Sequence, residues 1–412
     1  MIEVVDAVCG SGKTTWIFNE MRKHTDRKWL FVSPYLDEAG DGEEAGRIQK
    51  ELPELSFKSP TDTPTKSRSF LRLAKAGENI SCTHKLFTQF TPEVATVLQQ
   101  QEYHLVIDET INLVDFYEDI NSQDVIFLVR AGMVILCEST GRLSWNNEEW
   151  PNYTGRDLKI KQLCELGCLW LYGENVLIQR IPPTAMKACN SVTILTYMFE
   201  ASLMHSWMEL NSLEWKYLKP PEIKTNAEIK SIVRNLLNII EPSKTLLDMQ
   251  KTTQGLPLHS AFSSGWYSRA SEETLSTVKT SLEVSLKKQM RKGLVFWTTF
   301  KDYKNQLTGI GYTRSRKVDG VLLDPFISKN ERASNQYKDF VCCIHTVNVY
   351  PHVSLVNHLN TFGVSVDQDL YALSELIQFV FRGCIRQHQE MDVLVVSDRM
   401  RSLLCDWLKT DN

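Results

Sequence analysis

Residues 7–14 have the residue types and spacing of a phosphate-binding loop. They read, with alanine where the usual pattern begins with glycine, Ala7-Val8-Cys9-Gly10-Ser11-Gly12-Lys13-Thr14. In such a loop the main-chain N–H groups bind phosphate oxygens, the lysine reaches the β- and γ-phosphates, and the last hydroxyl holds Mg²⁺. The sequence therefore predicts a site for ATP and Mg²⁺, with Thr14 as a metal ligand, formed by Gly10, Ser11, Gly12, Lys13, Thr14 and Thr15.

The elements around this loop have the order that the chemistry requires. The mostly apolar run 2–6 predicts a strand before the loop, and residues 15–24 predict a helix after it. The helix would direct the positive end of its dipole at the phosphates. This context disfavours the alternative of a glycine-rich turn that happens to carry a lysine.

Two acids follow a second apolar run and could complete the reaction site. Residues 105–107 predict a strand that ends in Asp108 and Glu109. Asp108 would hold Mg²⁺, and Glu109 would orient or deprotonate the attacking water. A solvated strand end is the alternative for such a pair, and the preceding phosphate loop favours the catalytic interpretation.

A helix predicted over residues 370–386 carries the third group of candidates. Its apolar residues recur at helical spacing and predict a buried stripe. Gln378, Arg382 and Arg386 recur every four residues on a different face, and two guanidinium groups suit a developing γ-phosphate charge. A solvated polar face is the alternative. Gly383 has low helix propensity, which indicates close packing beside that turn.

Length and composition limit the class of protein. The 412 residues suffice for two or three domains, and a net charge of −4 provides no overall basic field for nucleic acid. The ten cysteines lack the spacing of a zinc site, so we expect reduced thiols and a cytoplasmic protein. The longest apolar stretch, 125–137, contains Arg130 and is too short to span a membrane.

The order of apolar and helical segments predicts an α/β fold with parallel sheets. We expect strands at 2–5, 29–33, 105–107, 133–136 and 192–196, and helices at 43–52 and 69–76. Residues 145–153 are expected to form a loop insertion. The prolines in 218–221 indicate a connector, after which we expect helices at 272–291 and 370–386 and strands at 293–298, 339–344 and 392–396. These patterns predict two lobes, 1–218 and 222–412.

With these pieces in order, the chain resembles the superfamily two helicases, in particular the compact helicase-like proteins of tailed bacteriophages. The segments that resemble helicase motifs are, in chain order, 7–14 (motif I), 29–38 (motif Ia), 82–87 (the Thr-His segment before motif II), 105–109 (motif II), 194–199 (motif III), 293–300 (motif IV), 332–337 (the segment that precedes motif V) and 378–386 (motif VI). The resemblance implies two RecA-like lobes with mostly parallel sheets, a nucleotide cleft between them, and an arginine finger in the last segment. Three residues separate Arg382 from Arg386 instead of the usual two, so either could be the finger.

The resemblance also implies a path for nucleic acid. Its residues would be Ser33, Pro34, Tyr35, Thr83, His84, Thr298 and Thr299. Thr83 and His84 could instead be a helix cap and an ordinary surface histidine. Motif II continues as Thr110-Ile111, which disfavours an RNA-specific DEAD-box protein. The expected partner is single-stranded or forked DNA, with RNA as the alternative, and the sequence does not specify an oligomeric state.

The expected activity is that of an ATP-dependent DNA helicase or translocase, in which Thr196 would relay between nucleotide and strand. Three alternatives remain open, of which a small-molecule kinase is disfavoured because such chains seldom carry a second lobe with an arginine-bearing late helix. A phage DNA-packaging ATPase would add a nuclease lobe with clustered acids, and an ATP-gated remodeller would hydrolyse ATP without unwinding. A phage source would place the protein in the cytoplasm of an infected host cell, in replication, recombination or repair.

Overall fold

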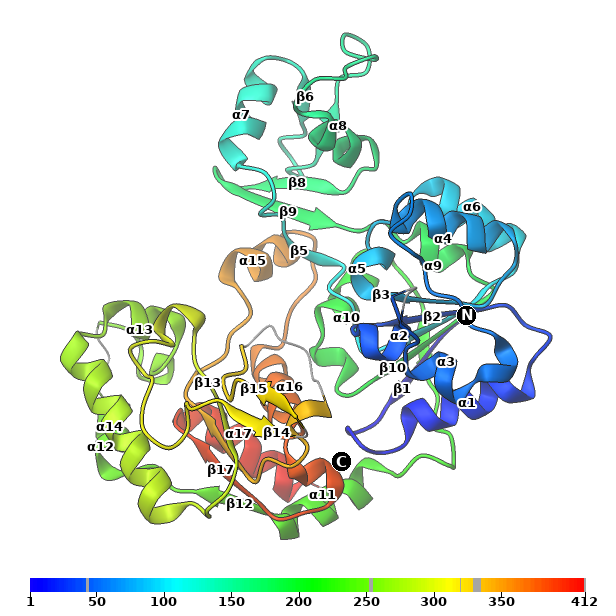
Figure 1. Ribbon diagram of the computed structural model, residues 1–412. Coiled ribbons are helices and arrows are strands. Elements are labelled where there is room, and N and C mark those ends of the chain that lie inside the picture. Colours follow the sequence, from blue (N-terminus) through cyan, green and yellow to red (C-terminus); the bar gives the residue numbers. More distant parts are fainter. Residues whose placement is uncertain (42–43, 252–254, 319, 329–334, 411–412) are drawn as a thin grey trace. The chain divides into compact units, whose positions relative to one another are not determined.

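The computed structural model describes residues 1–41, 44–251, 255–318, 320–328 and 335–410. The chain separates into two compact units (Figure 1). The first unit comprises Met1–Asp6, Lys13–Glu222 and His352–Val366. The second comprises Ala7–Gly12, Ile223–Pro351 and Asp367–Asn412. Residues 7–12, at the beginning of the phosphate loop, therefore belong to the second unit, although the residues on both sides of them belong to the first. Residues 352–366 belong to the first unit, although the residues on both sides of them belong to the second.

A parallel sheet forms the centre of the first unit. In the described part of the chain it has six strands in the order β11-β1-β10-β4-β2-β3, and every neighbouring pair is parallel. The strands are β1 (Ile2–Asp6), β2 (Trp29–Ser33), β3 (Ile80–Thr83), β4 (His104–Asp108), β10 (Ser191–Thr196) and β11 (Trp215–Tyr217). Every residue of β2 is buried, as expected of a strand covered on both faces. The predicted strands at 2–5, 29–33, 105–107 and 192–196 are confirmed.

Short helices accompany these strands. They are α1 (Lys13–Lys23), α2 (Leu36–Ala39), α3 (Arg47–Glu51), α4 (Lys66–Lys75), α5 (His84–Phe87), α6 (Pro92–Gln100), α9 (Thr184–Ala188) and α10 (Leu203–Leu210). The helix predicted at 69–76 is confirmed, and it begins earlier because the Thr65 side chain caps it by accepting from the Arg68 N–H. The helix predicted at 43–52 is shorter: α3 begins after Gly46, and residue 43 lies outside the described residues.

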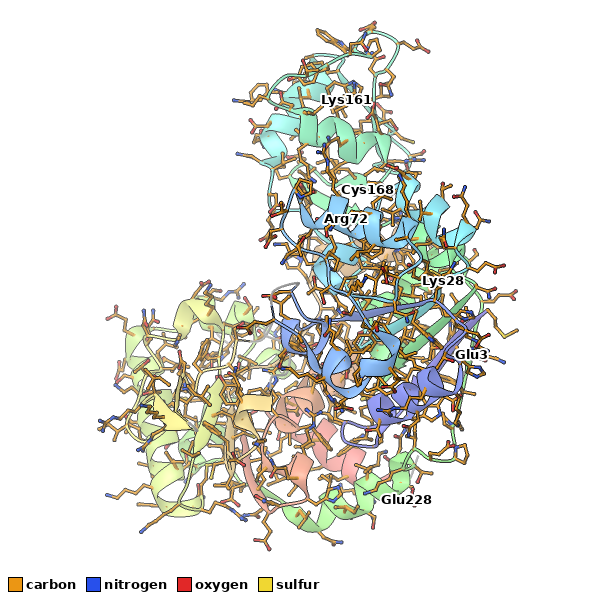
Figure 2. All side chains as sticks on the ribbon, turned by 45° about the vertical axis from the view of Figure 1, so that its right-hand side comes forward. Glu3, Lys28, Arg72, Lys161, Cys168 and Glu228 are labelled. Carbon is orange, nitrogen blue, oxygen red and sulfur yellow. The ribbon has the colours of Figure 1, made fainter. Side chains whose placement is uncertain are left out.

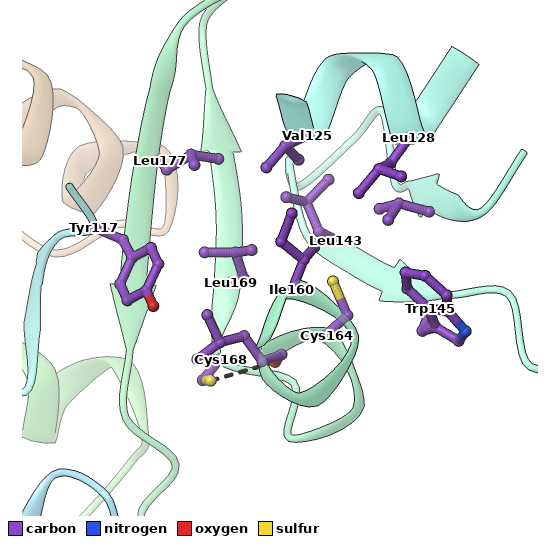
Figure 3. Packing of buried hydrophobic residues seen from close by; sticks show 12 residues of the cluster. Tyr117, Val125, Leu128, Leu143, Trp145, Ile160, Cys164, Cys168, Leu169 and Leu177 are labelled. Carbon is purple, nitrogen blue, oxygen red and sulfur yellow. Dashed lines mark hydrogen bonds between the residues drawn. The ribbon is translucent and has the colours of Figure 1, made fainter. Parts of the chain in front are cut away.

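Residues 114–180 form an insert with a core of its own. Its elements are β5 (Val114–Phe116), α7 (Ser122–Arg130), β6 (Val134–Leu136), β7 (Leu143–Trp145), α8 (Leu158–Glu165), β8 (Leu169–Tyr172) and β9 (Val176–Arg180). Val125, Leu143 and Leu169 are fully buried and pack in one cluster (Figure 3). Lys161 lies in α8 of this insert (Figure 2). Its ammonium donates to the Pro151 carbonyl, and this hydrogen bond connects α8 to the loop before it.

The insert corrects two expectations. Residues 133–136 were predicted as a strand of the parallel sheet, but β6 pairs with β7 in an antiparallel ribbon. The reason is local, because β7 follows after a short turn and Ile135 is 53% exposed, unlike a strand covered on both faces. Residues 145–153 were predicted as a loop insertion. Residues 146–153 do form a loop, but Trp145 ends β7 and its buried ring belongs to the insert core.

A segment distant in sequence packs against the insert within the first unit. It contains α15 (Val353–Thr361). The Arg180 guanidinium lies 4.3 Å from the ring centre of Trp170 and 4.5 Å from that of Phe362. His358 is 2% exposed and meets the Tyr172 ring edge to face. Aromatic and cation–π contacts of this kind hold the late segment in the first unit.

The second unit repeats the parallel arrangement on a smaller scale. Among the residues described, its main sheet has four strands in the order β12-β17-β16-β13, all parallel. They are β12 (Leu237–Ile240), β13 (Val295–Thr298), β16 (Cys342–His345) and β17 (Met391–Val395), with a hairpin of β14 (Arg316–Val318) and β15 (Val321–Leu323) beside them. The helices are α11 (Asn226–Leu236), α12 (Lys244–Met249), α13 (Ser264–Arg269), α14 (Glu272–Gln289), α16 (Gln368–Val380) and α17 (Asp398–Lys409). The α/β class with parallel sheets is confirmed.

The helix predicted over 370–386 ends at Val380 instead, so Arg382 and Arg386 do not continue one helical face. The Cys384 N–H donates to the Phe340 carbonyl at 3.0 Å and therefore leaves the helical hydrogen-bond pattern. Residues 384–387 form a separate 3₁₀ turn, η6 (Cys384–Gln387). The close packing predicted at Gly383 is present, since a Cβ built there would lie 2.9 Å from the Phe340 carbonyl oxygen.

Two further observations concern composition. All ten cysteines are free thiols. Across the described ranges of the chain, no helix has both the length and the apolar character needed to cross a membrane.

Candidate nucleotide-binding site

The carboxyl ends of three adjacent strands bring the predicted reaction groups to one edge of the first sheet. β1 ends at Asp6, β10 at Thr196 and β4 at Asp108. The register pairs Asp6 with Thr196, and Leu195 with Asp108. In parallel α/β sheets this edge is where ligands bind, because the loops and helix N-termini converge there.

The phosphate loop leaves β1 and enters α1 at Lys13. Gly10 and Gly12 have φ of +81° and +102°, a conformation that glycine adopts without steric cost. Both glycines are exposed, so a ligand can approach their main chain. Lys13 is 7% exposed, while the Ser11 hydroxyl is buried without a hydrogen-bond partner in the part of the chain described. A buried ammonium and an unpartnered hydroxyl suit an anionic ligand.

Residues 7–12 are held by the second unit through main-chain contacts. The Val8 N–H donates to the Asn226 side-chain oxygen at 3.0 Å, and the Lys224 N–H donates to the Ser11 carbonyl at 3.1 Å. The loop is therefore held by Asn226 in the first turn of α11 and by Lys224 just before that helix, in addition to its own strand and helix.

The acid pair lies where β4 ends. Burial raises the pKa of Asp108 to about 7, and the negative charges of Glu109 and Glu38 act in the same direction. The positive charges of Lys13 and Arg47 oppose this rise in pKa. Asp108 therefore lies among groups of both signs, with burial as the dominant influence.

Glu109 is held in an unusual backbone conformation. Its φ is +61°, which is uncommon for a residue with a side chain and carries a cost in energy. Its N–H donates to the Leu195 carbonyl at 2.8 Å, so β10 keeps the turn in place. Residues held in this way often lie at functional sites, where the surrounding structure supports the strain.

The donor set fits Mg²⁺ held partly by water and phosphate. Thr14 offers a hydroxyl at the start of α1, and Asp108 offers a carboxylate whose negative charge is disfavoured by burial. Within the described residues, no group of three or more His, Cys, Asp or Glu is arranged to hold a metal. Mg²⁺ is commonly bound through one or two protein oxygens plus substrate phosphates, so this sparse set is the expected one.

His84 and Thr83, predicted on the nucleic-acid path, have contacts of a different kind. His84 is 8% exposed, and its Nε2 donates to the Asp108 carbonyl at 2.9 Å. Thr83 caps α5 by accepting from the Leu86 N–H. His84 thus links the Thr-His segment after β3 to the acid pair, across the intervening β2.

The other predicted nucleic-acid residues divide by exposure. Ser33, Thr298 and Thr299 are at most 2% exposed, whereas Pro34 and Tyr35 are half-buried. Contact with a phosphate requires an accessible group, so Pro34 and Tyr35 are better placed to contact nucleic acid than the three buried residues. Of the segment predicted to precede motif V, residues 332–334 lie outside the described residues.

The late arginines occupy different environments in the second unit. Arg382 is 7% exposed and its guanidinium lies 6.0 Å from the Phe379 ring centre. Arg386 is exposed, and a Cβ built on Gly10 would lie 3.7 Å from its carbonyl oxygen and 3.8 Å from its Cγ. Gln378 lies in α16 and its amide donates to the Ser374 hydroxyl. The structure therefore brings Arg386, rather than Arg382, beside a phosphate-loop residue.

Sequence reasoning gave no role in this site to three charged residues. Asp6 is an acid directly before the loop, Glu38 ends the run that resembles motif Ia, and Arg47 forms an ion pair with Glu38 at 3.6 Å. Asp6 and Glu38 could have been suspected from their places after strands of a parallel sheet. No sequence signal marks Arg47, because its proximity to Asp108 depends on how α3 packs.

The α/β fold of this chain is similar to that of a solved structure, although the sequence identity is low. The solved structure of S. tokodaii Xpd4 is similar with a TM-score of 0.51 and 14% sequence identity, over 98% of this chain and 93% of that chain. An XPD helicase structure has a TM-score of 0.46 and 11% identity, over 99% of this chain and 90% of that chain. The first likeness confirms the resemblance to superfamily two helicases at the level of the fold.

Sequence comparison adds a relative of phage origin. The model of the YonV C-terminal Rossmann-like domain matches residues 231–408, which lie mostly in the second unit. The chain is 26% identical over 432 residues to the SPbeta prophage-derived uncharacterized protein YonV of Bacillus subtilis (strain 168), covering 99% of this chain and 98% of that protein. The prophage source of this relative agrees with the predicted resemblance to phage proteins.

Proposed function

We propose that this chain is an ATP-driven nucleic-acid motor that couples ATP hydrolysis to movement on single-stranded DNA. The observation that carries the proposal is one edge of the first sheet. The buried Lys13 follows β1 there, and the pair Asp108–Glu109 lies at the end of β4, two strands that flank β10 in the same parallel sheet. A phosphate loop and an acid pair in this order are the two parts that ATP hydrolysis requires. The nucleic-acid part of the proposal rests on the resemblance of the chain to helicases.

Each residue has a defined task in this proposal. The loop amides and Lys13 would hold the triphosphate, and Thr14 and Asp108 would hold Mg²⁺, which when bound neutralises charge on the phosphate oxygens. Glu109 would accept a hydrogen bond from the attacking water and direct it at the γ-phosphate. The first turn of α1 would add its free N–H groups, and Thr15 lies in this turn.

Arg386 is the better candidate for the arginine finger. Its side chain is exposed and lies beside Gly10, whereas Arg382 is buried near Phe379. A finger must reach the γ-phosphate as charge develops there, and a buried side chain is less able to do so. Arg382 would then hold the turn that presents Arg386, and Gln378 would support the same turn from α16.

Two of the alternative functions have no specific support. A nuclease lobe of a packaging ATPase needs clustered acids, but Asp324 pairs with Lys304, Asp369 pairs with Arg399, and Asp367 caps α16. Asp319 lies outside the described residues. A remodeller without unwinding activity would share the ATP site, so only an assay of strand displacement distinguishes it.

The test is ATP hydrolysis measured with and without single-stranded DNA and RNA, followed by displacement of a strand from forked duplexes. Lys13→Ala should abolish hydrolysis, and Lys23→Ala is the matched control, because Lys23 lies at the exposed end of the same helix and pairs with Glu20. Full activity of Lys13→Ala would refute the proposal. Hydrolysis stimulated by DNA without displacement would identify the remodeller.

The arginine assignment has its own test. Arg386→Ala should slow turnover by a factor of about 10³ or more while nucleotide binding stays intact, as for removal of an arginine finger. Arg382→Ala should reduce turnover less and reduce stability as well, because a buried side chain is lost. Equal turnover of Arg386→Ala and the parent would show that Arg386 is not the finger.

A further inference from the structure

The carboxylate of Asp6 holds the turn that follows β10. Its Oδ1 accepts from the Met198 N–H and its Oδ2 from the Phe199 N–H, both at 2.8 Å. Met198 has a φ of +56°, so the two N–H groups converge on one anion. Phe199 then begins a 3₁₀ turn, η2 (Phe199–Ala201), and Ser202 caps α10 directly after it. One acid before the phosphate loop therefore holds the whole entry into α10.

A neutral side chain would fill this position at lower cost. Burial is the largest influence on Asp6 and raises its pKa, against the opposing effects of the two N–H donors and of Lys13. Keeping a partly buried acid here needs compensation from its partners. Two of these partners are the fixed N–H groups of the turn, and the third is the ammonium that is predicted to bind phosphate.

The partners of Asp6 connect the phosphate site to the turn. A triphosphate bound to Lys13 would neutralise the positive charge that now lowers the pKa of Asp6. The carboxylate would then depend more strongly on Met198 and Phe199, because charged acceptors form the stronger hydrogen bonds. Binding at the loop would thus tighten the turn after β10, and with it the start of α10.

We propose that Asp6 is a positioning residue that transmits nucleotide binding from the phosphate loop to the turn Met198–Phe199 and to α10. The inference rests on the proposed function, because it needs a nucleotide on Lys13. In this inference the Asp6 carboxylate transmits the change that begins at the phosphate loop. The sequence had instead predicted Thr196 as the relay, a residue that is 1% exposed in β10.

The test is hydrogen exchange of the full chain with and without a non-hydrolysable ATP analogue and Mg²⁺. In the parent, nucleotide should slow exchange in the peptide that covers residues 197–210 as well as in the peptide that covers the phosphate loop. The amides of Met198 and Phe199 should slow by several-fold, because their existing hydrogen bonds to Asp6 become stronger.

Asp6→Asn and Glu200→Gln separate the relay from a merely structural role. Asparagine presents one acceptor oxygen and an NH₂ group, so one of the two N–H donors loses its partner. This variant should keep nucleotide protection at the loop and lose it at residues 197–210. Glu200 lies exposed on the same turn and accepts from the Tyr217 hydroxyl. Its charge is the smallest of the influences on the pKa of Asp6, so Glu200→Gln should keep nucleotide protection at both places, as in the parent.

The outcomes distinguish this inference from the proposed function. Protection of the loop without protection of residues 197–210 in the parent refutes the inference alone, and so does an Asp6→Asn variant that retains protection at both places. An unprotected loop in the parent refutes both. The parent measurement decides the matter even if Asp6→Asn does not fold.

Discussion

Gly383→Ala tests the geometry of the turn that carries both late arginines. Gly383 has a φ of −81°, which alanine adopts freely, so the substitution has no backbone cost of its own. Its entire effect comes from the space that the new methyl group needs.

The structure sets the size of that effect. The added Cβ would lie 2.7 Å from the Met391 Sδ and 2.9 Å from the Phe340 carbonyl oxygen, where ordinary contacts begin at 3.4 Å. Met391 is fully buried in β17, and the Phe340 carbonyl is held by the Cys384 N–H at 3.0 Å. Neither group can move without disturbing the core. Overpacking of this kind lowers the free energy of unfolding by about 1–3 kcal/mol.

Calorimetry of the full chain measures this loss. For a unit of this size, about 1–3 kcal/mol lowers the melting temperature by roughly 2–12 °C. Gly265→Ala in α13 is the matched control in the same unit, because its Cβ would meet only ordinary contacts of 3.5 and 3.9 Å. That variant should stabilise by about 0.4–1 kcal/mol and so identify the transition of the second unit. A Gly383→Ala protein as stable as the parent would show that the turn is not packed as described.

Two further predictions concern the first unit. Burial lowers the pKa of His358 to about 4, with the Arg180 charge acting in the same direction. The unfolded chain therefore binds this proton more readily, so up to about 3 kcal/mol of stability, present above pH 6.5, is lost as the pH falls through about 4. His358→Leu should flatten this part of the curve of unfolding free energy against pH, and an unchanged slope would contradict the assignment. Leu143→Ala should destabilise the insert by about 2–5 kcal/mol, because Leu143 is fully buried in its core. Limited proteolysis should then cut within residues 114–180 first, whereas equal protease resistance of the variant and the parent would mean that the insert has no core of its own.

Much of the fold was predictable because local patterns and tertiary packing agree. The strands at 29–33 and 192–196 were recognised because a strand buried on both faces is a continuous apolar run. The insert was not recognised, because its strands of three to five residues are no longer than many loops and pair with each other instead of the main sheet. Short antiparallel ribbons depend on a core formed by residues far apart in sequence.

The candidate site divides in the same way. The places of Lys13 and Thr14 at the start of a helix, and of Asp108 and Glu109 where a strand ends, were predictable from the pattern of a phosphate-binding loop and an acid pair. Their roles in nucleotide binding stay a prediction. The contact of His84 with the Asp108 carbonyl was not, since it reaches across β2 and depends on strand order. The sequence also did not predict that Arg382 is buried and Arg386 exposed. The four-residue spacing was interpreted as one continuous helix, but α16 ends at Val380.

The sequence by itself determined the class of fold and predicted the chemistry near its beginning. Both follow from rules that act over a few residues: apolar periodicity, the freedom of glycine in a loop, and acids placed after a strand. The tertiary structure decided that α16 stops at Val380, that residues 352–366 pack in the first unit, and that Asp6 binds the turn after β10. These features arise from hydrogen bonds and packing between residues up to about two hundred positions apart, whose free energies depend on the folded arrangement and leave no local pattern.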